Sequence, residues 1–156
     1  MRKSVDALVI GAGIHGAGCA QALAAAGHSV KVLEKIGIAC ATSCRSSKLI
    51  HGGLRYLESG QYSLVRESLR ERDILLRIAP GLVKREPFHI PVYRDTSRNR
   101  LTIRAGLTLY ALLDNLRPSC WFRSLPKREW GSLDGLDTRG LCTVFRYTDA
   151  RTDDAK

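Results

Sequence analysis

Residues 5–34, VDALVIGAGIHGAGCAQALAAAGHSVKVLE, decide the fold. The run VDALVI at 5–10 is short, apolar and followed by glycine, which predicts a buried parallel strand. Residues 19–26 are rich in alanine and predict a helix, which Gly27 is suited to end. Residues 29–33 predict a second strand. The segment therefore predicts one β-α-β unit of a Rossmann-like α/β fold.

The turn between the first strand and the helix carries the pattern G-x-G-x-x-G, formed by Gly11, Gly13 and Gly16. Gly11 permits a tight turn, Gly13 lets a pyrophosphate approach the backbone, and Gly16 lets the helix pack close to the strand. The N–H groups at the start of the helix attract phosphate. Glu34 follows the second strand and is placed to accept hydrogen bonds from an adenosine ribose. The motif predicts a dinucleotide site.

The sequence after Glu34 distinguishes between two dinucleotides. A compact NAD fold would continue with a second helix and a third strand. Residues 36–53 instead form an aperiodic, hydroxyl-rich loop that ends in a glycine pair. Such a loop suits a long cofactor that crosses it, which favours FAD over NAD.

The rest of the chain alternates between helical and extended patterns. The predicted elements are a helix over 54–79 that Gly60 can divide in two, a strand over 88–93, a helix over 101–116, turns over 119–140, and a strand over 141–147. The residues from 148 onward look like a strand end followed by the opening of a helix. Pro91 marks the strand over 88–93 as an edge strand or a bend.

The chain of 156 residues carries a net charge of +10, and the excess is local. Residues 77–128 contain eleven Lys and Arg against three Asp and Glu. This stretch favours a polyanionic neighbour, or it forms an ordinary solvated surface. The apolar helix over 101–116 lies within it and would be about 24 Å long, short of the roughly 30 Å hydrocarbon core of a membrane. That helix is expected at an anionic membrane interface or inside the protein.

The five cysteines form no C-x-x-C pair, and no histidine stands at zinc-finger spacing. A disulfide framework and a metal site are therefore not expected. Asp6, His15 and several glycines interrupt the apolar N-terminal stretch, so it is predicted to belong to the folded domain and not to a signal peptide. No nucleic-acid partner is expected.

Three stretches resemble the N-terminal part of FAD-dependent glycerol-3-phosphate dehydrogenase. They are GAGIHGAG at 11–18, the segment from 40 that contains SSKLIHGGLRYLE at 46–58, and YTDARTDDA at 147–155. The resemblance implies a glutathione-reductase-type flavoprotein domain. It also implies a cytoplasmic enzyme, peripheral at the inner face of the cytoplasmic membrane. Such an enzyme oxidises sn-glycerol 3-phosphate to dihydroxyacetone phosphate and passes electrons to quinone, or in related members to oxygen.

The resemblance also assigns residues. The segment along the FAD pyrophosphate and flavin matches Thr42, Ser43, Ser46, Ser47, Lys48 and Leu49. The stretch that closes on the isoalloxazine matches His51, Gly52 and Gly53. Arg55 and Tyr56 stand where the family handles its substrate, and a guanidinium fork suits a phosphate.

The resemblance divides the chain into a cofactor-binding core over 1–79, the start of a substrate and membrane-proximal region over 80–140, and a return to the FAD domain over 141–156. The family's remaining strands and its catalytic residues would follow, so the chain is expected to be a truncated, inactive start of the enzyme. Two alternatives stay open: a flavin-dependent amine or amino-acid oxidase, and a non-catalytic dinucleotide-binding fragment.

Overall fold

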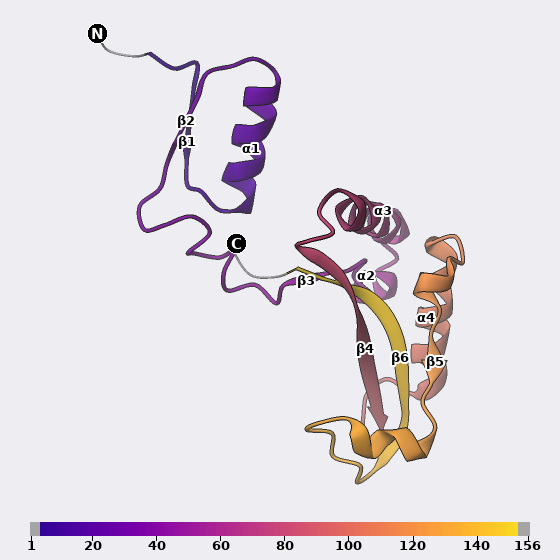
Figure 1. Cartoon of the computed structure of the whole chain (residues 1–156). Coiled ribbons are helices and arrows are strands. Elements are labelled where there is room, and N and C mark those ends of the chain that lie inside the picture. The colour runs from indigo at the N-terminus through magenta and orange to yellow at the C-terminus, as the bar shows by residue number, and fades with distance from the viewer. Residues whose placement is uncertain (1–3, 153–156) are drawn as a thin grey trace. The chain divides into compact units, whose positions relative to one another are not determined.

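The structure, a computed structural model, describes residues 4–152 (Figure 1). The chain divides into two compact units, one within residues 4–48 and the other spanning Leu49–Thr152. The structural boundary therefore lies after Lys48, and residues 49–79 share a unit with the segments that follow them. The predicted division into three functional regions stays a prediction. The predicted opening of a helix near the C-terminus lies outside the described residues.

The first unit is a β-α-β unit. Strand β1 (Ala7–Ile10) leads into helix α1 (Ile14–Ala25), and strand β2 (Val30–Leu33) returns beside β1. The two strands are parallel, with Ala7 opposite Val30. These elements confirm the prediction from residues 5–34. Helix α1 begins well before the alanine-rich stretch, directly after Gly13 and inside the glycine pattern.

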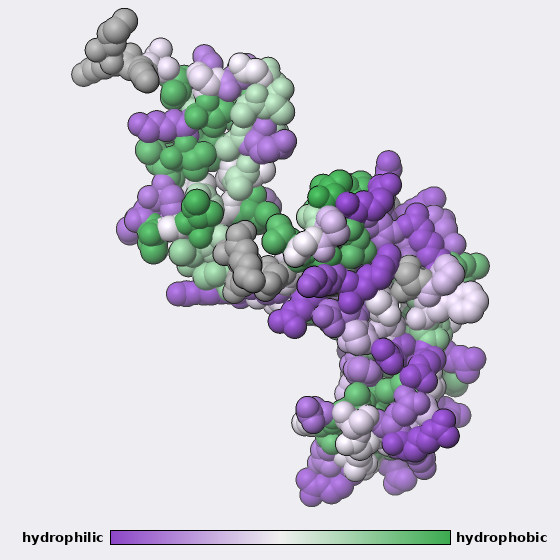
Figure 2. All heavy atoms as spheres, viewed as in Figure 1, coloured by the Kyte–Doolittle hydropathy of each residue, from purple (hydrophilic) through white to green (hydrophobic). Residues whose placement is uncertain are grey.

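The prediction that the first strand is buried is wrong within the described residues. Leu8 is 53% exposed and Ile10 is 84% exposed. The reason is architectural, because a parallel strand is buried only where both faces of its sheet are covered. Here the sheet has two strands, and α1 is the only helix of residues 4–48. Apolar side chains accordingly lie on the surface of this unit (Figure 2).

The second unit is an antiparallel sheet with helices. Its strands are β3 (Leu49–Ile50), β4 (Val83–Tyr93), β5 (Arg123–Ser124) and β6 (Leu141–Thr152). The long strand β6 is central, with β4 along one side and both short strands pairing with it too. Strand β4 begins five residues before the predicted strand, and it tolerates Pro87 and Pro91 because it is an edge strand.

The predicted helix over 54–79 divides at Gly60, as the pattern allowed. Gly60 has a φ of +70°, which ends α2 (Arg55–Glu58) before α3 (Tyr62–Ile78) begins. Two 3₁₀ helices, η1 (Pro118–Cys120) and η2 (Lys127–Ser132), lie in the predicted turn region.

Helix α4 (Arg100–Leu113) is shorter than the predicted 101–116. Its start is capped by Asn99, whose Oδ1 accepts from the N–H groups of Leu101 and Thr102, both at 2.9 Å. It ends early because Asn115 and Leu116 have positive φ angles. The helix buries Leu107, Tyr110 and Ala111.

The core of the second unit lies where the helices meet the sheet. One cluster joins α3 to α4 through Val65, Leu69 and Tyr110. A second joins α4 to the sheet through Leu107 and Phe145. Within residues 4–152 no helix is long and apolar enough to cross a membrane. The described side chains also include no cluster of three potential metal ligands.

Candidate functional site

The glycine turn of the first unit requires glycine for its backbone conformation at one position and for its close packing at another. Gly11 has a φ of +98°, a conformation that favours glycine. A Cβ at Gly16 would lie 1.9 Å from the carbonyl oxygen of Gly11, so only glycine fits there. Gly13 is the N-cap of α1 and provides no side-chain hydrogen bond to the helix. First-turn N–H groups of such a helix are suited to hold a phosphate.

The hydroxyl-rich loop folds back onto this turn. Ser43 Oγ accepts from the N–H of Ile14 at 3.0 Å, and a Cβ at Gly13 would lie 3.2 Å from the same oxygen. The carbonyl oxygen of Ser43 accepts from Lys48 Nζ at 2.7 Å and from Ser46 Oγ at 3.2 Å. The structure thus brings these three predicted residues together beside the start of α1.

Other predicted residues lie in the same loop without reaching that cluster. The carbonyl of Thr42 accepts from the N–H of Arg45 at 3.1 Å and closes a turn, and Ser47 follows this turn-rich segment. Backbone N–H groups, hydroxyls and an ammonium group suit the oxygens of a pyrophosphate. The residues present therefore fit the pyrophosphate part of FAD.

Glu34 is held against the turn at the end of β2. Its Oε2 accepts from the N–H of Ala12 at 2.7 Å, while Oε1 accepts from Lys35 at 2.7 Å and Ile36 at 3.0 Å. These backbone bonds, the one from Ala12 above all, lower the pKa of Glu34. A carboxylate oxygen can accept more than one hydrogen bond, so Oε2 can also accept from a ribose hydroxyl.

The second unit holds a pocket of about 830 Å³ at the loop that contains the glycine pair. Five of the predicted residues line it: Leu49, His51, Gly53, Arg55 and Tyr56. The lining also includes Phe88 from β4 and Tyr147 from β6. The structure thus places the predicted flavin loop and the predicted substrate residues in one pocket.

The two glycines of that loop are required by the chain's own packing. A Cβ at Gly52 would lie 2.7 Å from Leu69 Cγ and 2.7 Å from the hydroxyl of Tyr110. Gly53 has a φ of +70°, and its Cβ would lie 2.4 Å from the ring of Tyr56. The sequence predicted glycine here for the close approach of a flat ring. Contact with a flavin stays a prediction, while the packing is an independent reason for glycine.

A buried chain of hydrogen bonds anchors the loop. The N–H of Gly52 donates to the hydroxyl of Tyr110 at 2.7 Å, and that hydroxyl donates to Asp149 Oδ2 at 2.6 Å. Arg72 Nη1 donates to Asp149 Oδ1 at 3.1 Å. Burial, and the charge of Asp149, raise the pKa of Tyr110, so its proton stays in place to donate.

Arg72 is completely buried and is the centre of this network. It forms ion pairs with Asp73 and Asp114, each at 3.0 Å, besides the pair with Asp149. Cys120 contacts both Arg72 and Asp114, and burial is the first cause that raises the pKa of its thiol. A buried charge needs such partners, since removing one of them leaves the other uncompensated.

Sequence reasoning did not single out these residues. Asp149 stands within the YTDAR stretch, and its place in one of the three stretches that resemble the family is what could have pointed to it. Arg72 stands in a helix rich in charged residues, where arginine is ordinarily exposed.

Two arginines reach the pocket. Arg55 and Arg98 both line it, and Arg98 Nη2 donates to Glu58 Oε2 at 2.9 Å. The bond to Arg98 lowers the pKa of Glu58, and the charge of Arg55 contributes. Because both partners of the Arg98–Glu58 pair are about half exposed, solvent screens their attraction and the pair is weak. An incoming anion can therefore compete with Glu58 for Arg98.

His51 has a defined tautomer when neutral. Its Nδ1 accepts from the N–H of Gly53 at 2.9 Å, so the neutral ring carries its proton on Nε2. The loop thus presents a ring whose remaining nitrogen is a donor.

The glycine turn, the loop on its helix and the β-α-β topology define a dinucleotide-binding protein of the flavoprotein class. The sequence pattern of the FAD dependent oxidoreductase family matches residues 6–156, and the chain belongs to that family. FAD, predicted from the loop after Glu34, is thereby confirmed as the cofactor.

Comparison with known proteins confirms the resemblance found in the sequence. The chain is 44% identical to glycerol-3-phosphate dehydrogenase of Pseudomonas tolaasii over 97% of its own length and 28% of that protein. It is 41% identical to D-erythritol 1-phosphate dehydrogenase of Brucella abortus over 99% of its length and 30% of that protein. The chain therefore spans less than a third of these relatives.

A solved structure supports the fold. The L-alpha-glycerophosphate oxidase of Mycoplasma pneumoniae, determined with FAD bound, matches 97% of this chain and 39% of that one with a TM-score of 0.63. At 17% identity this likeness shows the fold alone. With the family match it confirms the predicted fold class, the Rossmann-like start of a flavoprotein domain. The amine or amino-acid oxidase alternative gains no better support.

Proposed function

We propose that this chain forms the FAD-binding start and one wall of the substrate pocket of an enzyme that oxidises sn-glycerol 3-phosphate to dihydroxyacetone phosphate. The observation that carries the proposal is the 830 Å³ pocket, where the loop of His51 and Gly53 meets Arg55 and Arg98. The glycerol-3-phosphate dehydrogenases among its relatives support the choice of substrate.

Different residues of the chain bind different parts of FAD. The glycine turn, Ser43 and Lys48 hold the pyrophosphate, and Glu34 accepts from the adenosine ribose. FAD, when bound, would supply the redox chemistry as the acceptor of the two electrons that the C2 alcohol loses.

In the pocket, Arg55 and Arg98 bind the phosphate of the substrate, since guanidinium forks match its oxygens. Phe88 and Tyr147 form an apolar wall that limits the access of water to the reacting carbon.

Exchange of segments tests this proposal. We would replace the matching segment of the Pseudomonas tolaasii relative with this chain and follow dye reduction driven by glycerol 3-phosphate, with D-erythritol 1-phosphate as the comparison substrate. Activity should be retained, and Arg55→Gln should raise KM about tenfold or more, because one charged hydrogen bond to the phosphate is lost. Arg66→Gln, an exposed arginine of α3 away from the pocket, is the matched control.

Two results would contradict the proposal. One is a hybrid that holds FAD and is reduced by amines or amino acids, but not by glycerol 3-phosphate or D-erythritol 1-phosphate. The other is an equal effect of the two arginine substitutions. The isolated chain with added FAD and a dye acceptor should give no turnover above a control without protein, because an oxidoreductase site is assembled from distant segments.

We further propose that the enzyme passes its electrons to quinone at the inner, cytoplasmic face of an anionic membrane. The support is an exposed apolar surface at the end of α4, within the stretch 77–128 that is rich in Lys and Arg. Leu112 and Leu116 are each about half exposed, Trp121 is 65% exposed, and Trp121 Nε1 donates to the carbonyl of Leu116 at 3.0 Å. Such a surface suits adsorption at an interface, where bases are attracted to anionic lipid.

Co-sedimentation with vesicles tests the membrane proposal. Binding should require anionic lipid, fall with salt, and weaken in Leu112→Ser with Trp121→Ser. The control is Ile78→Ser with Leu82→Ser, which removes two exposed apolar side chains elsewhere. Equal binding to neutral vesicles at high salt, or equal loss in both double variants, would reject it.

A further inference from the structure

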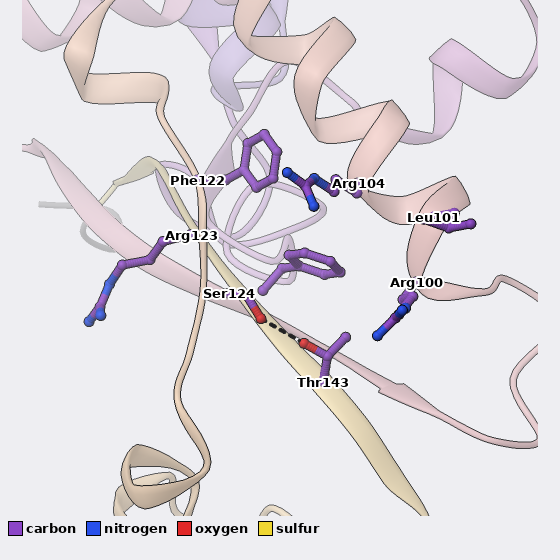
Figure 3. A pocket seen from close by; sticks show the side chains of 8 residues that line it. Arg100, Leu101, Arg104, Phe122, Arg123, Ser124 and Thr143 are labelled. Carbon is purple, nitrogen blue, oxygen red and sulfur yellow. Dashed lines mark hydrogen bonds between the residues drawn. The ribbon is translucent and has the colours of Figure 1, made fainter.

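A second pocket of about 390 Å³ lies between α4, β5 and β6 (Figure 3). Helix α4 contributes Arg100 and Arg104 to its lining. The remaining walls include Phe122 and Phe145, and the hydroxyls of Ser124 and Thr143. None of these residues lines the 830 Å³ pocket.

The two arginines place uncompensated charge beside this pocket. They stand four residues apart on one face of α4, where like charges repel and destabilise a helix. Neither forms an ion pair within residues 4–152. The third arginine of the lining, Arg123, directs its guanidinium away toward Glu129, which it contacts at 2.9 Å (Figure 3). An anion bound by Arg100 and Arg104 would remove the repulsion.

The rest of the lining combines two aromatic rings with two hydroxyl groups. The rings of Phe122 and Phe145 stand edge to face with centroids 6.1 Å apart. Ser124 Oγ and Thr143 Oγ1 lie 2.8 Å apart, so one hydroxyl donates to the other. The accepting hydroxyl keeps its own hydrogen, which it can donate to an oxygen of a ligand.

We propose that this pocket binds the phosphoryl group of an organic phosphate, with the phosphoryl oxygens between Arg100 and Arg104 and the organic body against Phe122 and Phe145. A phosphate fits better than a carboxylate because it offers more terminal oxygens and more charge to two guanidinium forks. An organic ester fits better than the inorganic ion because the rings provide apolar surface for its body. The phosphoryl group comes from a soluble ester or from a lipid headgroup.

Titration of the 156-residue chain tests the site. The probes are phenyl phosphate, inorganic phosphate and phosphatidylglycerol vesicles, and the readout is the shift of the Phe122 and Phe145 ring signals in NMR together with the dissociation constant. Phenyl phosphate should bind saturably and at least about tenfold more tightly than inorganic phosphate. Arg100→Gln with Arg104→Gln should weaken it about tenfold or more, the loss expected for one charged hydrogen bond.

The chain offers a matched control. Arg66 and Arg70 are also exposed and four residues apart, on α3, and neither lines the 390 Å³ pocket. Arg66→Gln with Arg70→Gln removes the same charge and should leave binding unchanged. Vesicle binding that depends on Arg100 and Arg104, and that phenyl phosphate displaces, identifies a lipid headgroup. Saturable binding of phenyl phosphate without such vesicle binding identifies a soluble ester. Equal loss in both double variants, equal affinity for the two soluble phosphates, or no saturable binding would overturn the proposal.

Discussion

The hydroxyl of Tyr110 should contribute far more to the free energy of unfolding than the hydroxyl of its neighbour Tyr147. Tyr110→Phe removes the acceptor for the N–H of Gly52 and the donor to Asp149, both in the buried interior. A neutral hydrogen bond contributes about 1 kcal/mol and one to a charged group about 2 kcal/mol, so the free energy of unfolding should fall by about 3 kcal/mol. That corresponds to about a hundredfold larger unfolding constant.

Tyr147→Phe is the control for the same chemical change. Tyr147 packs edge to face against Tyr110 at 6.2 Å, and within residues 4–152 its hydroxyl forms no hydrogen bond. Its removal should cost less than about 0.5 kcal/mol, as is usual for a substitution away from such contacts. Burial raises the pKa of Tyr147 to about 12, so both hydroxyls are protonated at neutral pH.

Urea unfolding followed by circular dichroism gives the two free energies, and hydrogen exchange of the Gly52 amide reports the loop directly. In Tyr110→Phe the Gly52 amide should exchange faster, while in Tyr147→Phe it should not change. If the two variants unfold at the same urea concentration and the Gly52 amide keeps its protection, the buried chain of hydrogen bonds does not anchor the loop.

Two further predictions concern the first unit. Gly16→Ala should abolish FAD binding, measured by flavin fluorescence, because its Cβ would lie 1.9 Å from the backbone of Gly11; Gly18→Ala meets no atom within 4 Å and should leave binding intact, so equal loss in both would refute the steric argument. Glu34→Ala should weaken binding of FAD, which carries the adenosine ribose, and leave binding of FMN unchanged; an unchanged FAD affinity would contradict the assigned role. The lowered pKa of Glu34 adds a pH dependence. Its stabilisation is present above the ordinary glutamate value of 4.5 and is lost as the pH falls through the lowered folded value. The difference in urea midpoint between the native chain and Glu34→Gln should therefore shrink from pH 7 to pH 3.

Local patterns predicted the first unit well because its contacts are close in sequence. The strand, glycine turn, helix and second strand occur within 30 residues, and each step has its own signal. The same patterns overestimated the burial of β1, since an apolar run shows only that a strand can be buried. Whether it is buried depends on what covers Leu8 and Ile10, and within residues 4–48 no further element does.

The sequence pointed to the loop residues that line the candidate pocket, but it did not predict the residues that hold this loop in place. A resemblance over residues 46–58 identified the loop and Arg55, yet it gave no indication of what holds the loop in place. That support comes from residues far away in sequence, since Tyr110 lies 58 residues from Gly52 and Asp149 lies 77 from Arg72. The periodicity of the sequence cannot predict such pairs, because they form only when α3 and α4 pack beside β6.

Arg72 shows why the sequence did not predict the support of this loop. An arginine in such a charged helix is expected to be exposed. Its charge can be buried here because three carboxylates, from α3, the end of α4 and β6, surround it. Two of these carboxylates are supplied by other elements, so the charge can be buried only in the assembled unit. The ion-pair network and the pocket loop therefore depend on the same packing. A change at Arg72 should loosen the Gly52–Gly53 loop, because Asp149 links the Arg72 guanidinium to the Tyr110 hydroxyl that holds Gly52.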